Sequence, residues 1–110
     1  MDPEERFSAL VDHFEGAPGV TAPGVGGTRG FGSAALKVNG SIFAMLSHGR
    51  LVVKLPRERV VSLIADGVGS PYDAGKGVPM KEWMSVAGGT DELWRALGRE
   101  ALDFVGARRR

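Results

Sequence analysis

The sequence of 110 residues predicts one domain of the α+β class. Two observations predict it. Apolar residues recur at helical spacing in three separate segments, near the start, in the middle and at the end of the chain. Between the first two helices, three strand-like segments follow one another across Asn39-Gly40 and His48-Gly49, as in an antiparallel meander.

The first helix has clear start and stop signals. Asp2 can cap it, Pro3 fits the first helical position, and Glu5 completes a capping-box spacing. Its apolar stripe consists of Phe7, Leu10, Val11 and Phe14. Gly16 ends the helix, and the Gly/Pro-rich segment 16–30 is expected to form a long loop, which at this length is usually mobile or functional.

The meander is predicted to comprise strands 31–38, 41–47 and 50–55. Strict alternation places Phe43 and Met45 on the face opposite Ile42, Ala44 and Leu46, and Val52 on the face opposite Leu51, Val53 and Leu55. A strand that is apolar on both faces is central, or has one face covered by another element or a partner chain. Phe43, Met45 and Val52 are therefore candidate residues of a protein interface.

The second half of the chain predicts two further helices and a strand. Pro56 opens the first of these helices and Gly67 ends it. A glycine-rich loop and a strand over 81–86 follow, and Thr90 is expected to cap the last helix. The apolar stripes of the two helices are Val60, Leu63 and Ile64, then Trp94, Leu97, Ala101 and Phe104.

Charge is distributed unevenly, although the net charge is only +1. Residues 29–59 contain six basic residues and one acidic residue, and this is the only region with an electrostatic preference for an anion. The candidate contacts for an anion or nucleic acid are Arg50, Lys54, Arg57 and Arg59, with Arg29 and Lys37 as possible additions. An ordinary solvated surface is the alternative interpretation.

Catalytic and metal-binding patterns are absent from the sequence. The chain has no cysteine, and its two histidines, His13 and His48, belong to no metal-ligand spacing. No serine lies in a nucleophile motif, and the adjacent carboxylates are explained by helix capping. We therefore expect no catalytic residue, no metal, no cofactor and no enzymatic activity.

The segment GSPYDAGKGVPM, residues 69–80, contains a Gly-Lys pair but does not form a phosphate-binding loop. Five residues instead of four separate Gly69 from Gly75, and Gly77 stands where a hydroxyl is needed. A strand follows where a helix N-terminus should supply a positive dipole. We expect no nucleotide at this loop, and Lys76 is interpreted as a surface charge.

The N-terminus is acidic, and no apolar run approaches the ~20 residues of a membrane span. These features predict a soluble, cytoplasmic protein without a membrane partner.

The order of several short motifs resembles the TfoX N-terminal domain family and, more distantly, YjbR-like proteins. The motifs are G-x-I-F-A at residues 40–44, G-R-L-V-V-K-L-P at 49–56, and P-M-x-x-W at 79–83. The resemblance covers about residues 29–104. It implies a two-layer, secretion-chaperone-like domain in which helices pack on an antiparallel sheet in the order α-β-β-β-α-β-β-α. It also adds a short strand near residues 70–74.

The chain departs from the family pattern in two places. The second, helical domain of the longer regulators does not follow, and the usual R-x-M-F-G motif reads Arg29-Gly30-Phe31-Gly32-Ser33. Both departures weaken a regulatory role of the kind that some relatives have.

The sequence therefore predicts a small non-enzymatic binding module that acts through protein contacts, with an unknown protein or with a second copy as a dimer. The alternative is a nucleic-acid-binding or regulatory domain that uses the basic residues of the third strand and second helix. Against this alternative stand the near-neutral net charge and the lack of a recognisable aromatic residue among the basic ones.

Overall fold

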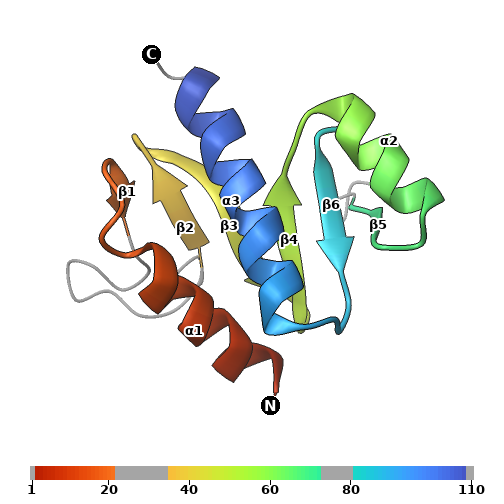
Figure 1. Cartoon of the computed structure of the whole chain (residues 1–110), viewed down its shortest axis with the longest axis horizontal. Coiled ribbons are helices and arrows are strands. Elements are labelled where there is room, and N and C mark those ends of the chain that lie inside the picture. Colours follow the sequence, from red (N-terminus) through yellow and green to blue (C-terminus); the bar gives the residue numbers. More distant parts are fainter. Residues whose placement is uncertain (1, 22–34, 73–80, 109–110) are drawn as a thin grey trace.

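A six-stranded antiparallel sheet forms one layer of the molecule, and helices cover one of its faces (Figure 1). The computed structural model describes residues 2–21, 35–72 and 81–108. The elements are α1 (Pro3–Phe14), β1 (Val20–Thr21), β2 (Ala35–Val38), β3 (Ser41–Ser47), β4 (Arg50–Lys54), α2 (Arg57–Ala65), β5 (Ser70–Pro71), β6 (Trp83–Val86) and α3 (Asp91–Arg108). The strand order is β1-β2-β3-β4-β6-β5. The predicted α+β class is confirmed.

The helices differ in how they meet the sheet. α3 crosses in front of β3 and β4, and α1 lies beside it (Figure 1). α2 lies at the end of the strand order opposite to β1, next to β6 and β5 (Figure 1). Because β6 runs antiparallel to β4, with Trp83 opposite Lys54, the start of α2 lies close to the start of β6.

Two very short strands flank the meander. β5 lies within the segment 70–74 where the resemblance implied a strand. β1 was not expected, because segment 16–30 reads as a loop in the sequence. Its two residues pair with β2 through Val20 opposite Val38 and Thr21 opposite Lys37. Two residues are too few to show an alternating pattern, so the pairing is visible only in three dimensions.

The predicted helix ends are confirmed. The Glu5 backbone N–H donates to the Asp2 carboxylate at 2.8 Å, and the reciprocal bond completes the capping box. The Leu93 N–H donates to Thr90 Oγ1 at 3.0 Å at the start of α3. Gly67 ends α2 with a φ of +80°, a conformation that glycine adopts without strain.

Both meander turns have the predicted tight geometry. Asn39 and Gly40 have φ values of 52° and 87°, and His48 and Gly49 have 53° and 76°. Two successive positive φ angles are the requirement of a type I′ turn, whose twist matches that of the flanking strands. These turns fix the register of β2, β3 and β4.

A β-bulge at Phe43 overturns the predicted alternation in β3. Leu36 lies opposite Ala44, but the next pair is Lys37 with Ile42, so Phe43 is an extra residue. Phe43 is 0% exposed, and its ring meets that of Phe14 edge-on at 5.9 Å. The bulge thus turns Phe43 towards the helices and into the core.

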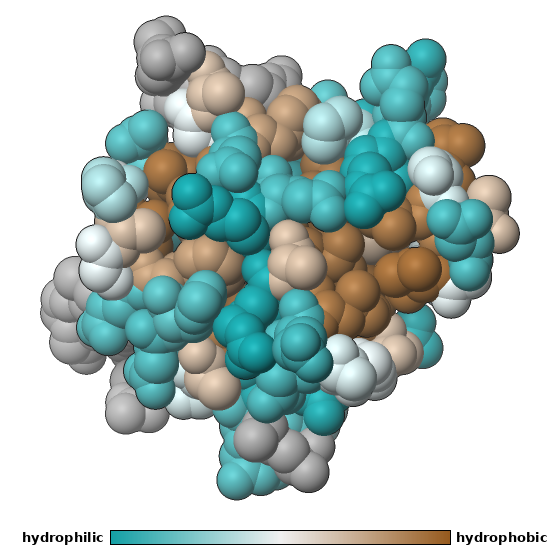
Figure 2. Space-filling view, viewed as in Figure 1, coloured by the Kyte–Doolittle hydropathy of each residue, from teal (hydrophilic) through white to brown (hydrophobic). Residues whose placement is uncertain are grey.

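The core lies between the sheet and helices α1 and α3. Its largest fully buried side chains include Phe14, Leu36, Leu51, Met84, Trp94 and Leu97. On the same face, apolar side chains gather between α3 and α2 (Figure 2). Within the described ranges, no helix combines the length and the apolar character that crossing a bilayer requires.

Candidate functional site

The predicted basic residues do not form one continuous surface. Arg50 begins β4 and Lys54 ends it, so about 13 Å of strand separates the two Cα atoms at ~3.3 Å per residue. Both side chains lie on one face of the sheet, as predicted, since they are four residues apart on the strand. Arg50 is exposed, at the opposite end of β4 from α2.

Arg59 is directed towards α3 and away from the other basic residues. Its Nε lies 2.8 Å from Glu100 Oε1, and its Nη2 donates to Glu100 Oε2 at 3.0 Å. The hydrogen bonds that Arg59 donates to Glu100, together with the negative charge of that carboxylate, raise the pKa of Arg59 above its ordinary value. The guanidinium is protonated throughout the physiological range. The ion pair between Arg59 and Glu100 thus links α2 to α3.

Two of the three residues of the predicted protein interface are buried within the chain. Phe43 is buried by the bulge, and Val52 is also 0% exposed. Met45 is half-buried. Alternation in β4 itself is as predicted, because Leu51 and Val53 belong to the core cluster and Val52 does not. Full burial leaves Phe43 and Val52 without surface to offer a partner.

The structure instead gathers three basic residues around one tryptophan. Lys54 and Trp83 face each other across β4 and β6, and Lys54 Nζ lies 5.5 Å from the centroid of the Trp83 ring. Arg57, at the start of α2, and Lys81, just before β6, line the same depression of about 480 Å³. Glu82 is the one acidic residue among the described lining residues, with Oε1 4.0 Å from Lys54 Nζ. We call this the polar depression.

A second, apolar depression of about 290 Å³ adjoins it and shares Arg57, Lys81 and Trp83. Its other lining residues are aliphatic: Val60, Val61, Ile64 and Pro71. Val61 is 63% exposed, the one large apolar side chain so exposed in the part of the chain described. The two depressions, with Lys54, Arg57, Lys81 and Trp83 around them, are called the Trp83 site.

A second aromatic ring stands beside the site. Tyr72 lies with its ring centroid 6.5 Å from that of Trp83, and the two planes are tilted by 53°. Both side chains are half-buried, so part of each remains accessible. An aromatic residue among cations is the element that the sequence reading did not find. The sequence did contain one signal for this arrangement. Lys81 and Trp83 are two residues apart at the start of a strand, a spacing that places two side chains on the same face.

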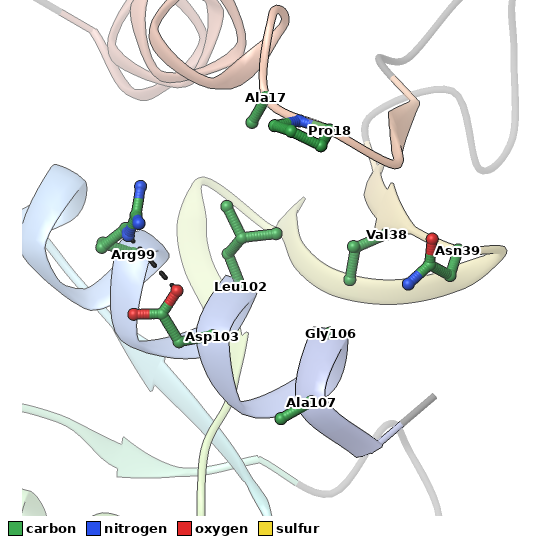
Figure 3. A pocket seen from close by; sticks show the side chains of 9 residues that line it. All are labelled: Ala17, Pro18, Val38, Asn39, Arg99, Leu102, Asp103, Gly106 and Ala107. Atoms are coloured by element: carbon green, nitrogen blue, oxygen red, sulfur yellow. Dashed lines mark ion pairs between the residues drawn. The ribbon is translucent and has the colours of Figure 1, made fainter. Parts of the chain in front are cut away.

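Another depression, of about 380 Å³, lies between α1, the β2–β3 turn and the end of α3 (Figure 3). Ala17, Pro18 and Val38 line one side of it. Its two charged residues neutralise each other, because Arg99 Nε lies 3.3 Å from Asp103 Oδ1 within one helix (Figure 3). With no converging charge or aromatic ring, this depression offers less to a ligand than the Trp83 site.

The histidines and carboxylates do not assemble elsewhere. His13 packs edge-on against Phe14 at 4.7 Å, and His48 Nδ1 lies 3.1 Å from Ser47 Oγ in the turn. Within residues 2–21, 35–72 and 81–108, no three metal-ligating side chains converge. Arg29, Lys76 and the family motif at 29–33 lie outside the described residues.

No protein-family model, curated protein or solved structure matches the chain. The ligand class is therefore inferred from the side chains of the Trp83 site.

Proposed function

We propose that this domain is a non-enzymatic binding module for single-stranded nucleic acid, with the Trp83 site as its contact surface. The observation that carries the proposal is the convergence of Lys54, Arg57 and Lys81 on Trp83. Proteins that bind single strands combine cations that follow the phosphates with aromatic rings on which bases stack. Every base has a flat face, so this combination needs no particular sequence.

The geometry favours a single strand over a duplex. In a duplex the base faces are covered by their neighbours, so Trp83 and Tyr72 would have nothing to stack on. A duplex would then be held by its phosphates alone, and three clustered cations supply few phosphate contacts. The near-neutral net charge of +1 also favours a local site over a broad basic surface.

The proposal replaces self-association as the leading function, because the apolar surface on which self-association depended is mostly buried. Kinship with the TfoX N-terminal domain family, and a cytoplasmic location, remain proposals. The kinship is supported by the order of the quoted motifs and by the two-layer arrangement of elements, and the location by a cysteine-free composition that suits a reducing compartment.

Fluorescence anisotropy with an end-labelled, mixed-sequence single strand of DNA or RNA tests the proposal. We expect binding at low salt, with a log–log salt slope of about −2, since three cations contribute ~0.7 each on a single strand. Trp83→Leu keeps an apolar side chain on the strand and should weaken binding roughly 5- to 150-fold, the range of one lost base stack.

A duplex of the same sequence is the ligand control and should bind more weakly. Circular dichroism and thermal melting establish that the Trp83→Leu variant is folded. Absence of measurable binding to any single strand at low salt would overturn the proposal. Equal binding by the wild type and by a folded Trp83→Leu variant would place the contact elsewhere.

A further inference from the structure

The two halves of the Trp83 site differ in chemistry. Among the described residues, the lining of the polar depression has three cations and one carboxylate, a formal charge of +2. The apolar depression contains aliphatic side chains, the Trp83 indole and the two shared cations. Trp83 belongs to both, so a ligand that fills the site must join an anionic group directly to an apolar, flat one.

The size of the apolar depression limits the flat group. At about 290 Å³ it lies just below the ~300–1,000 Å³ that small-molecule sites occupy. One ring system fits this space better than a run of stacked bases. The remaining nucleotides of a strand would have to continue outside the site.

The charge of the polar depression indicates which kind of phosphate group on a nucleic-acid strand would bind there. An internal phosphodiester carries one negative charge, whereas a terminal phosphomonoester carries about −1.5 to −2 at neutral pH. The formal charge of +2 matches the terminal group. Arg57 and Lys81, which are exposed, can turn several donors towards its three oxygens.

We infer that the Trp83 site holds the terminal, phosphorylated nucleotide of a strand, with its base in the apolar depression and its phosphomonoester in the polar depression. This inference rests on the proposed binding of single strands and names the part of the strand that is recognised. Both a strand end and a free nucleoside monophosphate carry this chemistry.

The lining residues also determine which terminal bases the site can distinguish. The described side chains of the lining provide hydrogen-bond donors, but those in the apolar depression include no acceptor. The amino groups that distinguish adenine and cytosine therefore find no side-chain partner there. Terminal bases are ranked by stacking area, purines above pyrimidines, and not by identity.

The test compares three forms of one labelled oligonucleotide at low salt by anisotropy: 5′-phosphorylated, 3′-phosphorylated, and with hydroxyls at both ends. We expect one phosphorylated form to bind at least roughly five-fold more tightly than the hydroxyl form, as for a gained charge-assisted hydrogen bond. Adenosine monophosphate should displace the strand at lower concentration than adenosine or inorganic phosphate alone.

Two matched pairs of variants locate the effect. Lys81→Ala should remove the preference for the terminal phosphate, whereas Arg59→Ala, which removes a cation held by Glu100, should keep it. Val61→Glu places a carboxylate in the apolar depression and should weaken binding of every form. Ser62→Glu, the next exposed position of α2, adds the same charge outside the lining.

Equal affinity for all three forms would overturn the inference and leave the proposed function standing. A preference that survives in folded Lys81→Ala would overturn the assignment of the phosphate to this depression. Failure of every form to bind would remove both the inference and the proposed function.

Discussion

Lys54 Nζ lies 5.5 Å from the centroid of the Trp83 ring, and the two residues are direct partners across β4 and β6. Twenty-eight intervening residues separate them in the chain, so sheet register alone brings them together. A cation over an indole face is a favourable pair worth about 0.5–1 kcal/mol when exposed. The pair places a cation beside an aromatic ring, which is the combination that the phosphate and the base of a nucleotide require.

Tryptophan fluorescence should report on the site selectively. The chain has two tryptophans, and Trp94 is 1% exposed with its Nε1 donating to the Gly88 carbonyl at 2.8 Å. Acrylamide should therefore quench Trp83 much more than Trp94. A single-stranded ligand should protect the quenchable fraction. In Trp83→Leu that fraction should disappear; strong residual quenching of Trp94 would contradict the described burial.

Two glycines of α3 should respond in opposite ways to alanine. A Cβ at Gly98 would stand 2.8 Å from Phe14 Cε2, and the Phe14 ring cannot retreat because it packs on Phe43. Gly98→Ala should cost about 1–3 kcal/mol of unfolding free energy. At Gly106 the nearest atom would be Val38 Cγ2 at 3.6 Å, an ordinary contact. Gly106→Ala should stabilise by about 0.5–1 kcal/mol.

Urea denaturation measures both changes. The pair is its own control, since the two substitutions have the same helix propensity and differ in the space that receives the methyl group. Stabilisation by both alanines would show that Phe14 can move away from α3.

Local signals in the sequence were sufficient for most of the fold. The Asp2–Glu5 capping box, the Asn39-Gly40 turn and the Gly67 helix end each depend on residues a few positions apart. The bulge at Phe43 could not be predicted this way, because it depends on how β3 pairs with β2. Alternation is a property of one strand, whereas a bulge is a property of two.

Truncation of Phe43 should reveal its place in the core. Phe43→Ala should cost about 3–5 kcal/mol, as expected for a large buried side chain. Met45→Ala, at a half-buried position two residues on, should cost about 1 kcal/mol. Thermal and urea melts compare the two variants. A near-neutral Phe43→Ala would restore Phe43 as a surface residue and would revive the protein-interface hypothesis.

Arg6 should couple α1 to the start of α3. Its Nε lies 2.8 Å from Asp91 Oδ1 in an ion pair that lacks hydrogen-bond geometry, and its Nη1 donates to the Gly89 carbonyl. The guanidinium also lies 5.5 Å from the Trp94 ring centroid. A double-mutant cycle of Arg6→Ala and Asp91→Ala should give a coupling of about 0.5–1 kcal/mol, since both side chains are partly exposed.

Additive effects of the two substitutions would mean that the carbonyl and ring contacts hold Arg6 without help from Asp91. The measurement uses urea denaturation at low and high salt. Added salt should reduce the coupling, because screening acts on exposed charges.

Only part of the candidate site could be predicted from the sequence. Lys54 and Arg57 stood out as part of a basic segment, but Arg59, two residues later, faces the opposite way and is held by Glu100. Lys81 and Trp83 come from a distant segment that the sheet brings to the same edge. Counting charges along the sequence identifies a segment rich in basic residues, but it cannot show which of those residues come together in the folded domain.

The most direct test of the account is the affinity for a single strand of the variants Arg57→Ala and Arg59→Ala at low salt. Each removes one cation from the same helix, but Arg57 lines both depressions and Arg59 does not. If the Trp83 site is the contact surface, Arg57→Ala weakens binding and lowers the magnitude of the salt slope by about 0.7, whereas Arg59→Ala leaves both nearly unchanged. Equal losses in the two variants would mean that binding follows total charge and that the Trp83 site has no special role.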